Sequence, residues 1–147
     1  MIKKLREDLD KRPELFCFEG PIDSSWLESW LADRHLLIPT DLKTLWCETG
    51  GGDIFETESI ISPRGRADLG DDIDSVNQFH WAKGMPREYL IFHIGLDGLT
   101  CVRLTTGEFV SVSEESYEPQ QTFASLADWY EGFIRAEYAA RYGLGEI

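Results

Sequence analysis

The spacing of apolar residues predicts helices toward both ends of the chain and strands between them. Trp26, Leu27, Trp30 and Leu31 recur at helical intervals after Asp23, a typical N-cap residue. A similar apolar stripe follows Pro39, which suits a first helical turn, and another follows Thr122. The three predicted helices cover residues 24–35, 39–49 and about 122–143.

Between the second and third of these helices the apolar pattern changes to that of strands. The segments are short, rich in β-branched and aromatic residues, and separated by Gly and Asp. Because their connections are too short for parallel crossovers, the sheet is predicted to be antiparallel. We therefore predict a single α+β domain over residues 1–147, with helices flanking five to six short strands. The clearest strands are residues 54–55, 59–61, 89–94, 99–104 and 109–112.

The glycine run in CETGGGDIFE, residues 47–56, has the composition of a phosphate-binding loop but the wrong position. Such loops precede a helix, whose positive end faces the anion. Here the glycines follow a predicted helix and have Glu48 and Asp53 as neighbours. The run is therefore predicted to end the helix and to turn the chain into a strand.

Composition narrows the classes of function. The chain has 27 acidic and 14 basic residues, a net charge of −13, which disfavours nucleic acid and anionic membranes as partners. No segment approaches the roughly 18 apolar residues that span a bilayer, and the charged N-terminus lacks the pattern of a secretory signal. Three widely spaced cysteines are typical of free thiols in a reducing compartment. We expect a cytoplasmic protein. The sequence leaves its oligomeric state open between a monomer and a weak homodimer.

The negative charge is concentrated in two stretches. Residues 53–74 hold seven acids and two arginines, and residues 107–121 hold four acids and no base. A cationic protein partner suits such a surface, although acidic loops also serve solubility alone. The candidate contacts, with one tyrosine as an aromatic anchor, are Asp68, Asp71, Asp72, Asp74, Glu114, Glu115, Tyr117 and Glu118.

The sequence offers little support for catalysis. Glu56 and Glu58 would share one face of a strand, where solvated acids are the expected explanation. His93 is expected on the face opposite Leu90, Phe92 and Ile94, as a structural or surface residue. The three histidines lack metal-site spacing, and Cys47 is expected to pack in its helix. We predict no catalytic residue, metal or cofactor. A deep pocket lined by a histidine or cysteine with a hydrogen-bonded carboxylate would favour a small hydrolase instead.

The aromatic residues of the last helix could stack on bases, but their surroundings lack the cations that single-strand binding requires. Packing in the core is therefore expected for most of them.

Two stretches of the chain resemble the SUKH superfamily, named for Syd, Us22 and Knr4 homologues. They are IPTDLKTLWCETGGGDIFETESIISP and IFHIGLDGLTCVRLTTGEFVSV, the second followed after a spacer by TFASLADWYEGFI. The resemblance covers roughly residues 20–135. It departs from the family at Gly50, where an asparagine is common. The resemblance implies structural roles for Pro39, Gly51, Gly52, Gly95 and Gly107.

The resemblance also implies a function in protein binding. Many bacterial members neutralise a toxin, often a nuclease, whereas fungal relatives are regulatory. We expect an immunity protein that occludes a basic toxin stoichiometrically. A regulatory interaction module of the same fold is the alternative, and a small hydrolase is a distant third.

Overall fold

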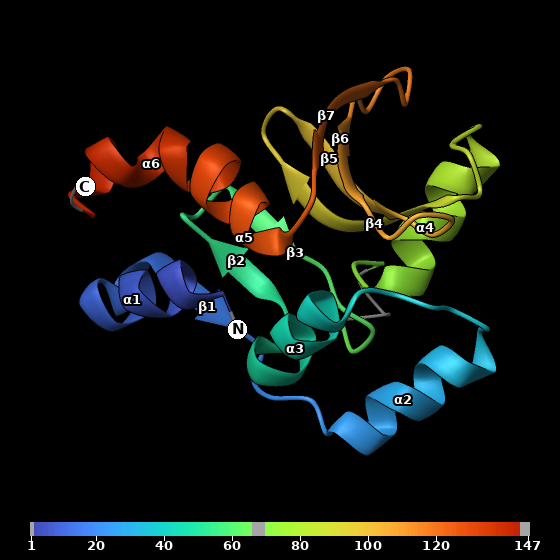
Figure 1. Ribbon diagram of the computed structural model, residues 1–147, viewed down its shortest axis with the longest axis horizontal. Helices are drawn as coiled ribbons and strands as arrows, with labels where there is room; N and C mark the ends of the chain where they lie inside the picture. Colours follow the sequence, from blue (N-terminus) through green and yellow to red (C-terminus); the bar gives the residue numbers. More distant parts are fainter. Residues whose placement is uncertain (1, 66–69, 145–147) are drawn as a thin grey trace.

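The computed structural model describes residues 2–65 and 70–144. In this part of the chain, seven strands form one antiparallel sheet, and each strand pairs with the next one along the sequence (Figure 1). The α+β prediction is confirmed, with seven strands rather than five to six. The strands are β1 (Phe16–Phe18), β2 (Gly52–Ile54), β3 (Glu58–Ile60), β4 (Tyr89–Gly95), β5 (Gly98–Arg103), β6 (Phe109–Val112) and β7 (Pro119–Phe123).

The two strands that the sequence did not predict, β1 and β7, lie at the edges of the sheet. Strand β1 is only three residues long, so it shows too little alternation to be recognised. The first four residues of β7 are exposed, and the strand begins with Pro119, which is tolerated at an edge. Because β7 occupies residues 119–123, the last helical region begins at Leu126 and not at Thr122.

The helices pack around the sheet and enclose a hydrophobic core that includes Trp46, Trp129 and Tyr130, all fully buried. The predicted N-cap is confirmed, since the Asp23 carboxylate accepts a hydrogen bond from Trp26 N. Trp26 itself is 42% exposed, unlike the rest of its predicted stripe. The helices are α1 (Lys3–Lys11), α2 (Ser24–Asp33), α3 (Thr40–Thr49), α4 (Ile73–Ala82), α5 (Leu126–Trp129) and α6 (Arg135–Tyr142), with a π-helical segment (Tyr130–Ile134) joining the last two.

Helix α4, absent from the sequence-based prediction, covers the part of β4 that β3 leaves unpaired. Strand β3 pairs with β4 only at Ile94 and His93. Further along β4, the fully buried amide of Asn77 replaces a neighbouring strand. Its Oδ1 accepts from Ile91 N at 2.6 Å, and its Nδ2 donates to Ile91 O at 3.1 Å. The side chain thereby satisfies both backbone groups of a buried residue.

The glycine run ends α3, as predicted. Gly50 adopts a left-handed conformation at the helix C-cap, and its N–H donates to Trp46 O. A Cβ on Gly51 would lie 2.7 Å from Ile60 O, so this residue has no room for a side chain. The run is a tightly packed turn that leads into β2.

Helices α1 and α6 lie side by side at the left of Figure 1 and are held together by a buried carboxylate. Asp8 is 2% exposed and accepts hydrogen bonds from Tyr130 Oη and Arg135 Nε, each at 2.7 Å. Two basic residues of the α1 end, Lys11 and Arg12, donate to the carbonyl oxygens of Leu144 and Tyr142. Cations thus occupy the negative end of α6, where the helix dipole favours them.

Candidate functional site

The first acidic segment is largely structural in the part that the structure describes. Asp72 is 7% exposed and caps α4, since its Oδ2 accepts from Ser75 N at 3.2 Å. Burial opposes the charge of Asp72, but hydrogen bonds from Ser75 and from the backbone of Asp72 and Asp74 together outweigh it and lower the pKa of this carboxyl. Asp74 forms an ion pair with Arg34 at 2.7 Å, and Asp71 is exposed. Asp68 lies outside the described residues.

Three of the four acids in the second acidic segment lie in the β6–β7 loop, residues 113–118, which reaches the other end of α4. Its carboxylates Glu114, Glu115 and Glu118 are exposed, as expected. Tyr117 is not an exposed anchor: the residue is 8% exposed, and its Oη lies 2.8 Å from His80 Nδ1 of α4. Between Asp72 and His80 the helix advances about 12 Å, so the two acidic segments contact α4 at different ends.

Glu58 differs most from the expectation of a solvated acid. It is 5% exposed on β3, whereas Glu56 is exposed in the preceding turn, so the two do not share a strand face. Oε1 of Glu58 accepts from His93 Nε2 at 2.7 Å, and Oε2 accepts from Tyr138 Oη at 2.8 Å. Thr57 Oγ1 adds a longer bond to Oε2 at 3.3 Å. The carboxylate joins three segments that are distant in sequence.

His93 continues this network into the sheet. It is 2% exposed, and its Nδ1 lies 2.9 Å from Thr100 Oγ1 on β5. Thr100 Oγ1 also accepts from Trp129 Nε1 at 3.1 Å. One assignment of protons satisfies all three contacts. The Trp129 indole donates to Thr100, the Thr100 hydroxyl donates to His93 Nδ1, and the protonated Nε2 of His93 donates to Glu58. The pairing register of β4 with β5 shifts between Ile91 and His93. The face on which His93 lies therefore could not be predicted from simple alternation along β4.

This network holds Glu58 in its ionised form. Burial raises the pKa of the carboxyl, but interactions led by the hydrogen bonds from His93 and Tyr138, with a further one from the Leu96 N–H, outweigh it and lower the pKa below its usual value. Both His93 nitrogens and the Thr100 hydroxyl are already engaged. The arrangement resembles a nucleophile–histidine–carboxylate series, but Thr100 is fully buried and its oxygen already accepts a hydrogen bond from an indole. The network of Glu58, His93 and Thr100 therefore has the geometry of a structural element that holds these side chains in place.

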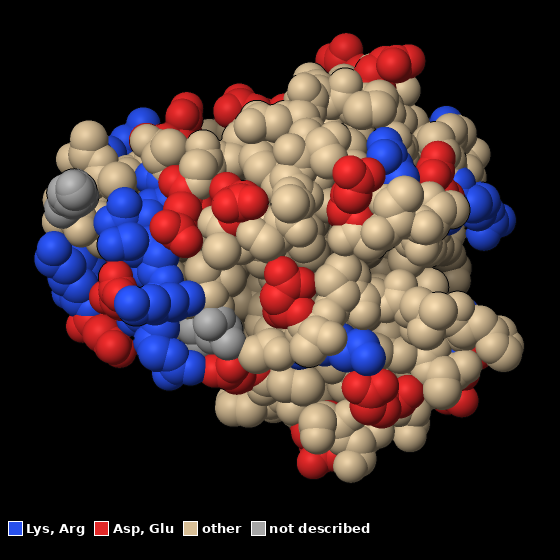
Figure 2. All heavy atoms as spheres, viewed as in Figure 1, with Lys and Arg blue, Asp and Glu red and all other residues tan. Residues whose placement is uncertain are grey.

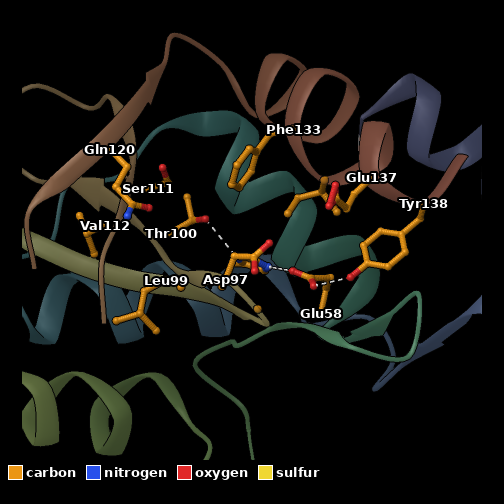
Figure 3. A pocket seen from close by; sticks show the side chains of 14 residues that line it. Glu58, Asp97, Leu99, Thr100, Ser111, Val112, Gln120, Phe133, Glu137 and Tyr138 are labelled. Carbon is orange, nitrogen blue, oxygen red and sulfur yellow. Dashed lines mark hydrogen bonds and ion pairs between the residues drawn. The ribbon is translucent and has the colours of Figure 1, made fainter. Parts of the chain in front are cut away.

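A pocket of about 170 Å³ opens above this network, between the β4–β5 hairpin and the last helical region (Figure 3). Glu58 lies at its buried end, and the exposed residues Asp97 and Glu137 also line it. Phe133 and Tyr138 contribute aromatic rings. The pocket therefore combines three carboxylates with aromatic walls.

Gly95, which the resemblance marked as a fold position, makes room for the buried end of the pocket. A Cβ at this position would lie 2.9 Å from His93 Cε1 and closer still to Glu58 Oε1. Either contact is too short for real atoms, so a larger residue would displace the carboxylate. Gly95 therefore has a local role beyond its hairpin: it lets Glu58 and His93 meet.

The other candidates for chemistry are not supported. Burial, followed by neighbouring acids, raises the pKa of the half-buried Cys47, which disfavours a reactive thiolate. Across the described part of the chain, no group of histidine, cysteine and acidic residues is arranged to hold a metal ion. No described helix is long and apolar enough to cross a membrane.

Charge is unevenly distributed over the surface. Figure 2 shows lysine and arginine gathered at the left, over α1 and α6. Residues 3–12 contain five basic and three acidic side chains, and the other residues contain the remaining nine basic and 24 acidic ones. The net charge outside α1 and its flank is thus −15.

Comparison with known proteins identifies the family. The model of the SMI1/KNR4 family (SUKH-1) matches residues 21–132, which is 112 of the 147 residues. A search of curated proteins finds no significant match. The matched region contains the whole sheet except β1, but neither α1 nor α6. The chain belongs to the SMI1/KNR4 (SUKH-1) family.

Proposed function

We propose that this protein is an immunity-type binding protein that neutralises a basic, nuclease-type toxin by covering it in a stoichiometric complex. A toxin that cleaves nucleic acid has a cationic surface, because it must bind phosphate. The observation that carries the proposal is the net charge of −15 outside α1 and its flank in a member of this family. Such a surface attracts a basic protein over long distances and speeds association.

The exposed side of α4 and the β6–β7 loop are the proposed contact surface. Phe79 on α4 is 60% exposed, and its ring lies edge-on to His80, which bonds to Tyr117 at the base of the loop. The carboxylates Glu114 and Glu115 are exposed in the same loop. An exposed aromatic residue near unburied acids is a typical centre for a binding energy hot spot.

Free cysteines support an action in the cytoplasm, where thiols stay reduced. Cys17, Cys47 and Cys101 are unbridged in the structure. Burial also raises the pKa of Cys101, which keeps this thiol inert. A regulatory interaction module of the same fold would share these features and differ only in lacking a toxin partner.

The test is co-expression with the product of the reading frame next to its gene. We expect rescue of growth, a one-to-one complex in size-exclusion chromatography, and association that slows with added salt. The variant Glu114→Lys/Glu115→Lys should weaken binding about tenfold or more. Asp72 is left unchanged because it caps α4 and is buried.

Glu7→Lys/Asp10→Lys on α1 makes the same change of charge on the basic side of the molecule and should bind as the wild type does. Equal binding by both variants would contradict the proposed surface. A neighbouring product that is harmless to cells, or turnover of a substrate by the purified protein, would contradict the immunity function.

A further inference from the structure

The pocket beside Glu58 has the chemistry of a receptor for one cationic side chain. We propose that it binds the guanidinium group of an arginine on the partner protein. This inference rests on the proposed function, because it assumes a basic partner, and it assigns part of the recognition to a concave site. No residue of the β6–β7 loop lines that site, but Val112 and Gln120, on the strands beside the loop, do.

The charge of the pocket lining favours a cation. Glu58, Asp97 and Glu137 line the pocket, and the lining residues that the structure describes include neither lysine nor arginine. Glu58 is buried and ionised, while the other two carboxylates are exposed at the opening. A positive group that enters would replace water next to three acceptors.

The size of the pocket favours a single side chain. Small-molecule sites usually enclose about 300–1,000 Å³. The pocket encloses about 170 Å³, which is below that range and suits a single side chain better than a nucleotide or a larger cofactor. It is also partly open, so that a side chain projecting from another protein can reach it while its backbone stays outside.

The aromatic wall at Phe133 favours guanidinium over ammonium. Phe133 lines the pocket, and a planar guanidinium stacks on such a ring while its N–H groups form paired bonds with carboxylates. The Tyr138 ring is already packed against Phe55, with ring centres 4.9 Å apart. The molecule already contains a related contact outside the pocket. Arg141 places its guanidinium carbon 5.4 Å from the centre of the Tyr138 ring.

The pocket is held in place before any ligand binds. The hydrogen bonds of His93 and Tyr138 fix Glu58, and the packing of Phe123 against Phe133, with ring centres 5.3 Å apart, supports one wall. A preformed site loses little conformational entropy on binding. The π-helical segment forms part of this wall, and such irregular turns are frequent at functional sites.

Part of the pocket lies outside the region that matches the family model. Phe133, Ile134, Glu137 and Tyr138 follow residue 132, where the match ends. They come from the helical region that Asp8 of α1 fastens to the body of the protein. The arrangement suits a site that adapts a shared fold to one partner.

The direct test is a titration of the full-length protein with N-acetyl-arginine amide, followed by NMR of the Phe133, Tyr138 and Gly95 signals. We expect saturable shifts with a dissociation constant of about 1–10 mM, as befits one side chain. N-acetyl-citrulline amide has the same shape without the charge and should give no saturable shift. Agmatine, a small free molecule with a guanidinium group and an amine, should have an affinity within a few-fold of that of N-acetyl-arginine amide.

Asp97→Asn/Glu137→Gln should weaken arginine binding by about tenfold, because two of the three carboxylates are lost. The matched control, Asp10→Asn/Glu131→Gln, removes the same charge from exposed sites outside the pocket lining and should bind like the wild type. Absence of saturable shifts, equal binding of citrulline, or unchanged binding by the pocket variant would overturn the inference. Agmatine binding tenfold tighter or more would also overturn it, in favour of a free metabolite.

The same variants separate this inference from the proposed function. With the toxin in hand, the pocket variant should lose about tenfold in affinity and the control variant should not. A toxin complex that is unaffected by the pocket variant would overturn the role of the pocket and leave the immunity function standing. Arginine binding without toxin neutralisation would overturn the immunity function and, with it, the assignment of the pocket to a toxin's side chain.

Discussion

The carboxylates on two sides of the molecule differ in burial and in bonding. Asp8 and Glu58, in the part built from α1, β3 and α6, are 2% and 5% exposed and accept several hydrogen bonds each. Glu114 and Glu115, in the β6–β7 loop, are exposed. The first pair organises the structure, and the second pair contributes charge to the surface.

This difference explains why net charge alone is a poor guide to the functional site. A buried carboxylate that loses its partners carries a large desolvation cost, whereas an exposed one is solvated by water and screened by salt. Substitution on the two sides should therefore differ in its main effect: the buried acids should mainly change stability, and the exposed acids should mainly change partner binding.

The largest effect is expected at Asp8. Asp8→Ala removes the carboxylate that pairs with Arg135, whose side chain is 12% exposed, and also the acceptor of the Tyr130 hydroxyl. The free energy of unfolding should fall by about 3–5 kcal/mol in urea denaturation followed by tryptophan fluorescence. The exposed neighbour Asp10→Ala should change it by less than about 0.5 kcal/mol. A loss below about 1 kcal/mol for Asp8→Ala would show that this ion pair is not a structural fastening.

A smaller loss is expected at Glu58. Glu58→Gln replaces charge-assisted hydrogen bonds with neutral ones and should cost about 1.5–3 kcal/mol at pH 7. Glu56→Gln, in the exposed turn, is the matched control.

The effect of Glu58→Gln should depend on pH. The folded-state pKa of Glu58 lies below the ordinary 4.5, so its contribution is complete above the unfolded-state pKa and is lost as pH falls through the folded pKa. The gap between wild type and variant should therefore narrow as denaturation is repeated below about pH 4.5. A gap that stays constant down to pH 3 would mean that ionisation of Glu58 is not its source.

The smallest effect on stability is expected in the β6–β7 loop. Glu114→Gln/Glu115→Gln removes two exposed charges and should leave the free energy of unfolding within about 0.5 kcal/mol of wild type. Thermal unfolding in the same buffer provides a second reading. A clear destabilisation would place these residues with Asp8 and Glu58, among the structural acids.

The sequence identified the parts of the fold whose patterns are local. The helix at residues 39–49 was predicted from its apolar stripe, and the turn at Gly50 from its place after that helix. Helix α4 was missed, although Asp72 as a cap and Ile73, Val76 and His80 at helical spacing were available signals. Strand β7 carried no comparable signal, because an exposed edge strand needs no apolar alternation.

The candidate site was predicted only where surface charge defines it. Glu114, Glu115 and Glu118 are exposed as expected, but Tyr117 is buried against His80. The pocket was not predicted, because its residues are far apart in sequence. His93 lies 35 positions after Glu58, and Tyr138 lies 80 positions after it. No spacing rule covers such distances.

The sequence by itself determined the class of the fold, the helix-ending glycine turn and the excess of acid, because each depends on neighbouring residues or on composition. Only the tertiary structure decided which acids are buried. A carboxylate enters the core when donors from distant segments converge on it and offset the loss of water. For Glu58 those donors are His93 and Tyr138, and the close approach depends on the missing side chain of Gly95.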